Sequence, residues 1–303
     1  MTLQQLKYVV VTASVGTISK AAEKLYISQP SLTAAIKELE QEFGITIFIR
    51  HNKGVVPTAQ GEEFLGYARQ VLSQANLMKE RYAGSGSFQH QFCVSTQHYS
   101  FAVEAFVELL TQYGGEEYDF RIRETQTYEI IEDVSKLKSE VGVLYLNPFN
   151  ESVLRKTFKE HDLQFERLFM AKPHVFIGTG NPLAQQKSVT LKDLEPYPRL
   201  SYEQGEHNDF YFSEEILSTR ECKKNIMVRD RATLFNLLIG LNGYTICSGV
   251  INEELNGEDI IAIPLEVDDY MEIGYITHKR VVQGPYAKLY IEALKRLALS
   301  SEK

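Results

Sequence analysis

The stretch TISKAAEKLYISQPSLTAAIKELEQEF, residues 17–43, constrains the fold of this chain more than any other feature. It predicts two helices joined by a tight turn. Thr17 is in position to cap the first helix, and Ser28 is in position to cap the second, because a hydroxyl can accept from free backbone N–H groups. Pro30 falls in the first turn of the second helix, where its missing N–H costs little. The apolar residues of the first helix recur at helical spacing: Ile18, Ala21, Ala22 and Leu25.

The second of these helices has two different faces. Its apolar stripe consists of Leu32, Ala35, Ile36, Leu39 and Phe43. The opposite face carries Gln29, Pro30, Thr33, Ala34 and Lys37. A helix that enters the DNA major groove needs short side chains that reach base edges and a cation that reaches phosphate. An ordinary helical hairpin with a solvated polar face would fit the same spacing.

The residues that follow favour the DNA-binding interpretation. Residues 45–50 have the composition of a strand, residues 51–54 that of a turn, and Val55 and Val56 begin a return strand. A β-hairpin directly after a recognition helix is a wing. Arg50, His51 and Lys53 would then lie against phosphate or in the minor groove.

The run AAEKLYISQPSLTAAIKELEQEFGITIFIR, followed by VPTAQGEEFL, resembles the winged helix-turn-helix of LysR-type transcriptional regulators. The resemblance covers residues 1 to about 88 and implies binding to a dyad-symmetric site on double-stranded DNA. Gln29, Pro30, Thr33 and Ala34 would read base edges, and Lys37, Arg50 and Lys53 would hold phosphates. The predicted DNA contacts are Thr17, Ser28, Gln29, Pro30, Ser31, Thr33, Ala34, Lys37, Arg50 and Lys53.

The distribution of charge agrees with an N-terminal DNA-binding part. The chain as a whole has a net charge of −8, but residues 1–60 contain six Lys or Arg against four Glu, a net charge of +2. Such a mildly basic head predicts weak nonspecific affinity per copy, so we expect two or more heads per assembly.

Chain length and cysteine content indicate the number of domains and the cellular compartment. A chain of 303 residues predicts two or three domains. Neither a secretory signal nor an apolar run of membrane-spanning length is present, so we expect a cytoplasmic protein that contacts no membrane. Cys93, Cys222 and Cys247 lack metal-ligand spacing, and we expect them to be reduced, buried thiols.

A long helix is predicted after Pro57, with Thr58 as its cap. Its apolar residues alternate in steps of four and three: Phe64, Ala68, Val71, Ala75, Met78 and Tyr82. Such a seam also occurs on helices that pack within their own domain. Since the wing has just closed its domain, we expect no adjacent polypeptide here and favour a coiled coil between two copies. Gly84–Ser87 would form a flexible joint.

From residue 91 onward, strands and helices alternate, which predicts an α/β domain with a mostly parallel sheet. Residues 165–170 and 173–178 are expected to be strands of a second lobe, residues 208–219 a helix, and residues 260–267 a strand that returns to the first lobe. The family resemblance implies two lobes, as in periplasmic binding proteins. The predicted organisation is a winged helix-turn-helix at 1–57, a linker helix and hinge at 58–88, and an effector domain at 91–303. Its first lobe comprises 91–164 with 266–303, and its second lobe 165–265.

Ligands of open α/β folds bind beyond the carboxyl ends of the strands. Hydroxyls and amides in those loops suit a small polar or anionic ligand, and the resembling family holds its effector there. Ser95, Thr96 and Ser100 could instead be helix caps, Arg229 could belong to an ion pair, and His98 could be a satisfied loop histidine. The predicted effector contacts are Ser95, Thr96, Gln97, His98, Ser100, Thr125, Gln126, Asn147, Ser201, Tyr202, Arg229 and Ser248.

No nucleophile elbow, zinc-protease motif or phosphate-binding loop occurs, and the seven histidines show no ligand spacing. We therefore predict a regulator that is not an enzyme and uses no cofactor, with a small-molecule effector controlling how it engages DNA. The family resemblance implies a homodimer that forms a homotetramer, and we expect contact with RNA polymerase. The alternative is a solute-binding protein with the same two-lobe cleft and no role on DNA.

Overall fold

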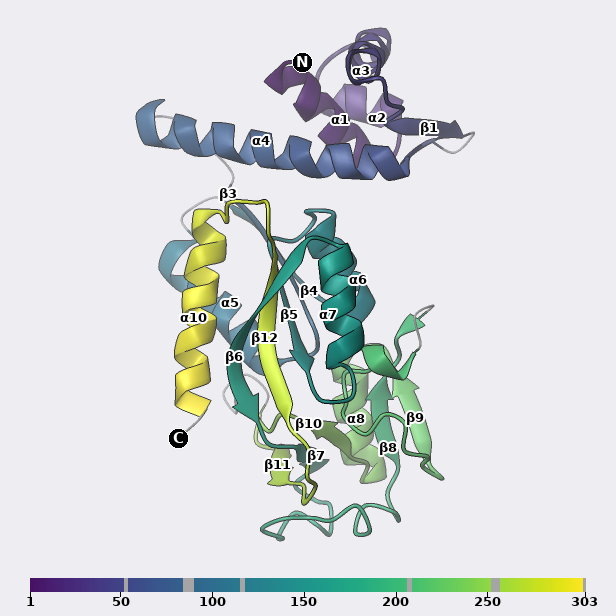
Figure 1. Cartoon of the computed structure of the whole chain (residues 1–303), viewed down its shortest axis with the longest axis vertical. Coiled ribbons are helices and arrows are strands. Elements are labelled where there is room, and N and C mark those ends of the chain that lie inside the picture. The colour runs from purple at the N-terminus through teal and green to yellow at the C-terminus, as the bar shows by residue number, and fades with distance from the viewer. Residues whose placement is uncertain (52–53, 84–89, 115–117, 206–208, 252–256, 302–303) are drawn as a thin grey trace. The chain divides into compact units, whose positions relative to one another are not determined.

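A computed structural model describes residues 1–51, 54–83, 90–114, 118–205, 209–251 and 257–301 (Figure 1). Residue contacts divide the chain into two compact units. The first contains residues 1–91 and 136–138, and the second contains residues 92–135 and 139–303. Each unit is described by itself.

The first unit contains the helix-turn-helix and the wing. Its elements are α1 (Leu3–Val15), α2 (Ile18–Lys24), α3 (Gln29–Phe43), β1 (Phe48–His51), β2 (Gly54–Pro57) and α4 (Ala59–Ala83). The Ser28 hydroxyl accepts from the N–H of Ser31 at 3.2 Å and caps α3, as predicted. Thr17 occupies the cap position of α2, but its side chain makes no cap hydrogen bond.

The wing is an antiparallel hairpin of β1 and β2. Its first strand begins at Phe48, three residues later than predicted. The reason lies in α3, because the Glu40 carboxylate accepts hydrogen bonds from the N–H groups of Ile47 at 2.7 Å and Phe48 at 3.2 Å. These two hydrogen bonds attach the chain to α3 at the point where the hairpin starts.

The N-terminal half of α4 packs against α1 within the first unit. Leu65 and Ala68 are buried in the same core as Leu6, Val9 and Leu39. The expectation that this helix has no adjacent polypeptide is therefore wrong for its first turns, because α1 covers them. The Tyr82 side chain and Gly84–Ser87 lie outside the described residues.

Further along α4, apolar side chains face outward. Val71 is 40% exposed and Met78 is 62% exposed. The predicted seam is therefore buried at the start of α4, where it stabilises the first unit. Further along the helix the seam is exposed, and this unit does not cover it.

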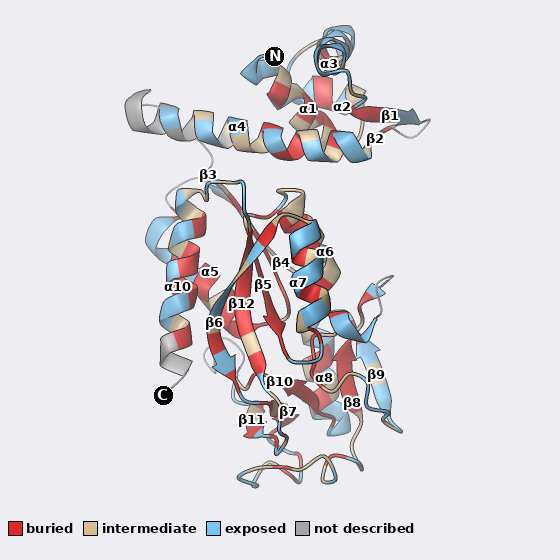
Figure 2. Ribbon diagram, in the orientation of Figure 1, coloured by how far each residue is buried: buried red, intermediate tan, exposed pale blue. Residues whose placement is uncertain are grey.

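The second unit begins with a five-stranded sheet of order β4-β3-β5-β12-β6 (Figure 1). Its strands are β3 (His90–Thr96), β4 (Tyr118–Glu124), β5 (Val141–Leu146), β6 (Leu163–Ala171) and β12 (Met271–His278). The helices of this lobe are α5 (Ser100–Tyr113), α6 (Thr127–Ser135), α7 (Glu151–Glu160) and α10 (Pro285–Ser301). Strand β5 is buried along its whole length, which places the core between these helices and the sheet (Figure 2).

The sheet is mixed, and the prediction of a mostly parallel sheet is wrong. Strands β3 and β5 are parallel, but β12 runs antiparallel to both β5 and β6. The β12 strand comes late in the chain, so the local βα alternation could not reveal that it enters the sheet from the opposite direction.

The described residues of the second lobe include two smaller sheets and the helix α8. Strands β7 (His174–Gly178), β10 (Thr245–Cys247) and β11 (Ile260–Pro264) form an antiparallel sheet, and β8 (Arg199–Tyr202) and β9 (Asn225–Val228) form a parallel pair. Helix α8 covers Arg231–Leu241. Two predictions are corrected here, because β6 belongs to the first lobe and β11 to the second. The chain thus crosses between lobes after β6 and again after β11.

A helix was expected over residues 208–219, and the described part of this segment has only the short 3-10 turn η2 (Phe210–Phe212). The rest of the described segment is a loop of bends and turns that is held by other elements. The Tyr145 hydroxyl donates to the carbonyl of Ser213 at 3.1 Å, and the Arg199 guanidinium donates to the carbonyl of Leu217 at 3.1 Å. This loop carries Glu214 and Glu215 toward the first lobe. Within the described residues, no helix has the length and apolar character needed to cross a membrane.

Candidate DNA interface and ligand pocket

Helix α3 presents the predicted DNA-reading face to solvent. Leu32, Ile36 and Leu39 are buried, and the residues of the opposite face are exposed or, for Thr33, half-buried. This division follows the helical period, because residues three and four apart share one face. Ser28, Gln29, Pro30, Ser31, Ala34 and Lys37 are exposed.

The wing adds a second cationic edge to the first unit. Arg50 is exposed on β1, while Lys53 lies outside the described residues. The N–H of Val55 donates to the carbonyl of Gly16 at 2.8 Å and ties the wing to the loop before α2. A side chain at Gly54 would approach that same carbonyl to 2.2 Å, so glycine is needed where the wing passes this loop. Thr17 is half-buried, and its hydroxyl has no partner in the described part of the chain.

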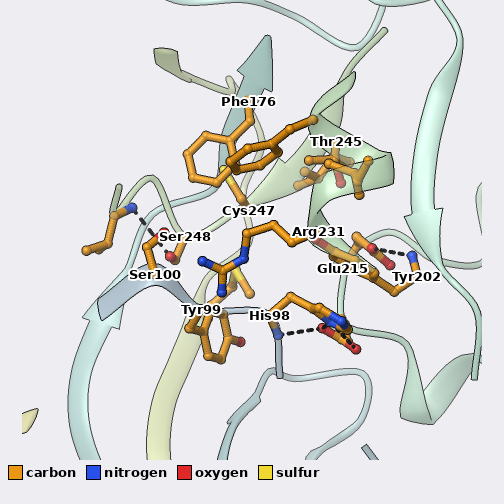
Figure 3. A pocket seen from close by; sticks show the side chains of 16 residues that line it. His98, Tyr99, Ser100, Phe176, Tyr202, Glu215, Arg231, Thr245, Cys247 and Ser248 are labelled. Atoms are coloured by element: carbon orange, nitrogen blue, oxygen red, sulfur yellow. Dashed lines mark hydrogen bonds and ion pairs between the residues drawn. The ribbon is translucent and has the colours of Figure 1, made fainter. Parts of the chain in front are cut away.

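The second unit contains a pocket between its lobes (Figure 3). The first lobe contributes the loop before α5 and the start of β12, and the second lobe contributes β7, β8, α8, β10 and the loop after η2. The cavity volume is about 40 Å³, a few times the roughly 10–15 Å³ that a single water needs. The lining residues are His98, Tyr99, Ser100, Phe176, Tyr202, Glu214, Glu215, Arg231, Leu234, Phe235, Thr245, Ile246, Cys247, Ser248, Val250 and Met271.

His98 joins the two lobes on one side of this pocket. Its backbone N–H donates to Glu214 Oε2 at 3.0 Å, and its Nδ1 lies 2.9 Å from the same oxygen. Both side chains are 5% exposed. Burial lowers the pKa of His98, but the charge and hydrogen bond of Glu214, together with the charge of Glu124, raise this pKa above its usual value. The contact is a buried His–Glu pair across the lobes, which is ionic when His98 is protonated.

A second ion pair also crosses between the lobes. Arg231, the first residue of α8, binds the carboxylate of Glu124 at the end of β4. The Arg231 side chain is 15% exposed and that of Glu124 is 27% exposed. The Nε atom of Arg231 is buried and has no hydrogen-bond partner among the described residues.

Glu215 is the most deeply buried acid of the pocket. Its Oε1 accepts from the N–H of Tyr202 at 2.9 Å. Burial, together with the neighbouring Glu214 carboxylate, raises the pKa of Glu215 to about 8. At neutral pH this carboxyl group therefore keeps its proton and is a hydrogen-bond donor as well as an acceptor.

The structure gathers one third of the predicted effector residues in this pocket. His98, Ser100, Tyr202 and Ser248 line it. Eight others are not among its lining residues: Ser95, Thr96, Gln97, Thr125, Gln126, Asn147, Ser201 and Arg229.

Most of these eight side chains serve the fold. Ser95 donates to Asp133 at 2.8 Å, the Gln97 amide donates to Thr127 at 2.6 Å, and Asn147 accepts from the N–H of Asn150. Arg229 is 78% exposed and pairs with Glu203. Thr96 donates to the carbonyl of Gln97, and Thr125 donates to Glu129. The Gln126 side chain lies beside Gly205. Ser201 precedes Tyr202 on β8 and so points to the opposite face of the strand.

Sequence reasoning missed Glu214, Glu215 and Arg231. The two acids fell in a segment that was expected to be helical, so nothing placed them at a cleft. Arg231 did carry a signal. A cation at the first position of a helix opposes the helix dipole, and its presence there indicates a carboxylate or ligand nearby.

Within the described ranges, no group of three His, Cys, Asp or Glu side chains could hold a metal ion. Cys93, Cys222 and Cys247 are free and half-buried. Burial raises the pKa of the Cys247 thiol far above its usual value, so this pocket residue is a protonated, apolar wall.

Two family models match most of the chain. The model described as a bacterial regulatory helix-turn-helix protein of the lysR family matches residues 3–62, and the model described as a LysR substrate binding domain matches residues 92–298. The first match covers the helix-turn-helix and the wing, and the second covers both lobes around the pocket.

Individual relatives match shorter parts. The chain is 30% identical over 196 residues to the Hca operon transcriptional activator HcaR of Escherichia coli strain K12, covering 64% of this chain and 63% of that protein. It is 41% identical over 81 residues to the regulator ClcR of Pseudomonas putida, covering 27% and 28%. The chain thus spans less than two thirds of the length of these two relatives.

A solved structure shows the same fold. A full-length OxyR variant from Pseudomonas aeruginosa has a TM-score of 0.64 to this structure at 20% sequence identity, covering 97% of this chain and 98% of that chain.

Proposed function

We propose a mechanism of regulation for this chain, which belongs to the LysR family of bacterial transcriptional regulators. In this mechanism α3 enters the DNA major groove, and Gln29, Pro30, Thr33 and Ala34 read base edges. Lys37, Arg50 and Lys53 bind phosphates, while Thr17, Ser28 and Ser31 contribute at the start of the two helices. The exposure of the short polar side chains on α3, opposite its buried stripe, supports this assignment.

The second unit senses a small polar molecule in the pocket between its lobes. The observation that carries this proposal is that both lobes supply polar side chains to one cavity, with His98 and Ser100 from the first lobe and Glu214 and Arg231 from the second. A ligand that contacts both lobes favours one lobe arrangement over another, and so shifts the population of assemblies that engage DNA.

The active form is an oligomer of this chain. The exposed Val71 and Met78 on α4 support a helix-to-helix contact between two copies, and a pair of such dimers would present four DNA-binding heads. The regulator works in the bacterial cytoplasm, contacts RNA polymerase, requires no cofactor and catalyses no reaction.

The experiment screens small metabolites for their effect on binding of the full-length protein to its own upstream DNA, followed by fluorescence anisotropy. An effector shifts the binding curve of the wild type but not of Ser100→Leu, which places an apolar side chain in the pocket. Thr219→Leu, an exposed site on the same unit, is the matched control and keeps the response. An effector response that survives Ser100→Leu at full strength contradicts regulation through this pocket.

A further inference from the structure

The two side chains of the Arg231–Glu124 ion pair differ in how far they are buried. Arg231 lines the pocket, whereas Glu124 is not among its lining residues and has more exposed surface. Burial raises the pKa of Glu124 above its ordinary value, and Arg231 offsets this only in part. Its burial in this ion pair therefore disfavours the ionised carboxylate of Glu124. This side chain can move into solvent if a ligand binds Arg231 more strongly.

The pocket offers more hydrogen-bond donors than its own acceptors use. The buried Arg231 Nε–H has no partner in the described structure. The Ser248 oxygen accepts from the N–H of Val250 at 3.4 Å, which leaves its own O–H to donate. Ser100 opens helix α5, whose cap residue makes no side-chain cap hydrogen bond. In Figure 3 the Arg231 guanidinium projects between Ser100 and Ser248 on one side and His98 and Glu215 on the other.

The acids of the pocket are not free to receive a cation. Glu214 accepts from the backbone and ring of His98 and from the Gln204 amide at 3.4 Å. Glu215 is buried and protonated at neutral pH, as shown above, so it neither attracts an ammonium group strongly nor repels an anion. The surplus of donors thus favours a ligand that brings acceptors and negative charge.

We propose that the ligand of this pocket is a small carboxylate, and that its carboxylate group binds Arg231 in competition with Glu124. The guanidinium fork matches a carboxylate in shape and charge, and Ser100 and Ser248 supply neutral donors beside it. Exchange of Glu124 for the ligand breaks an ion pair between the lobes, which links binding to lobe arrangement. This inference rests on the proposed function, because it assigns the chemical class of the regulator's ligand.

Because the cavity is small, the test ligands must be small molecules. Propionate, propionamide and propylammonium are matched in length and differ in charge, and their binding to the full-length protein can be followed by saturation-transfer NMR at pH 7. The inference predicts that propionate binds and that the amide and the ammonium ion give no signal above a bovine albumin control. Equal binding of the amide, or preferential binding of the ammonium ion, overturns it.

Two pairs of variants locate the site. Arg231→Gln loses the propionate signal, whereas Arg229→Gln keeps it, since Arg229 is exposed and outside the pocket. Glu124→Gln removes the competing carboxylate and tightens propionate binding about fivefold or more. Glu203→Gln, which breaks the exposed pair with Arg229, leaves the affinity unchanged.

The Glu124→Gln variant tests the proposal even if Arg231→Gln fails to fold. If the Glu124 carboxylate competes with the ligand, its removal must tighten propionate binding. If Glu124 has only a structural role, no tightening is expected. Unchanged affinity in Glu124→Gln, or a propionate signal that persists in folded Arg231→Gln, contradicts the assignment. The measurement contains no DNA, so its failure is separate from a failure of the proposed regulation, which the anisotropy experiment reports.

Discussion

The imidazole ring of His98 lies flat against the phenol ring of Tyr202, with ring centroids 3.7 Å apart and ring planes within 3° of parallel. His98 belongs to the first lobe and Tyr202 to the second. The same histidine binds Glu214, so one side chain makes both an aromatic and an ionic contact across the pocket. His98 therefore supplies two of the contacts that join the two lobes.

Replacement of His98 by alanine should destabilise the second unit. The change leaves the buried Glu214 carboxylate without its cation and removes the stack on Tyr202, and loss of one partner of a buried ion pair costs about 3 kcal/mol or more. Urea unfolding followed by circular dichroism measures the free energy of unfolding. The double variant His98→Ala/Glu214→Gln should recover part of the loss, because the unpaired charge is gone. Simple additivity of the two single changes would contradict the pairing.

Stability should fall as pH rises between about 4.5 and 8. The unfolded chain releases the Glu215 proton near 4.5, while the folded protein holds it until about 8. Across that window the folded state binds the extra proton, so the free energy of unfolding decreases by at most about 1.4 kcal/mol per pH unit from this group. His98, whose pKa is also raised, acts in the same direction above its ordinary value of 6.5.

The check is a series of urea titrations from pH 5 to 8.5 on the wild type and Glu215→Gln. Burial raises the pKa of Glu215 most, and the Glu214 carboxylate raises it further, while the Tyr202 N–H and Arg199 lower it. Glutamine keeps the shape and cannot titrate, so the variant should show a shallower pH dependence. Identical slopes would show that Glu215 is ionised in the folded protein.

Loss of Lys37 or Arg50 should weaken DNA binding through the phosphates. Each alanine variant should lower affinity for all sequences by a similar factor and reduce the slope of log affinity against log salt by about 1. Lys279→Ala removes an exposed lysine of the second unit and provides a control of equal net charge. A salt slope that matches that of the control would place Lys37 and Arg50 away from the DNA.

Much of the first unit was predictable because its signals are local. The Ser28 cap, Pro30 and the apolar stripe of α3 all act within one turn of helix. The delayed start of the wing was not predictable, since it depends on Glu40 bonding residues seven and eight positions later. The packing of Ala68 against α1 is likewise a contact between distant residues, which a heptad pattern alone cannot distinguish from a dimer seam.

The pocket was predictable in location and only partly in composition. His98, Ser100, Tyr202 and Ser248 follow strands, and the strand-end rule found them. Glu214 and Glu215 arrive on a loop whose course is set by Arg199 and Tyr145 from other elements. The pocket is lined by Arg231 and not by Arg229, two residues earlier, and Asp230 between them caps α8.

The exposed part of α4 should mediate self-association. Met78→Glu places a charge on a side chain that is 62% exposed in this unit, and burial of that charge at a contact between two copies would be unfavourable. Sedimentation velocity should show the dimer dissociation constant rising about tenfold or more. Gln185→Glu adds the same charge at an exposed site of the second unit, away from α4, and should leave association unchanged. Equal association of both variants would rule out this face.

The central claim, sequence-specific regulation of DNA, is tested most directly by fluorescence anisotropy of the full-length protein with the DNA upstream of its own gene. A scrambled duplex of the same composition is titrated beside it at several salt concentrations. We predict tighter binding to the upstream duplex, with affinity falling along a straight line of log affinity against log salt. Equally weak binding to both duplexes at every salt concentration would contradict the claim.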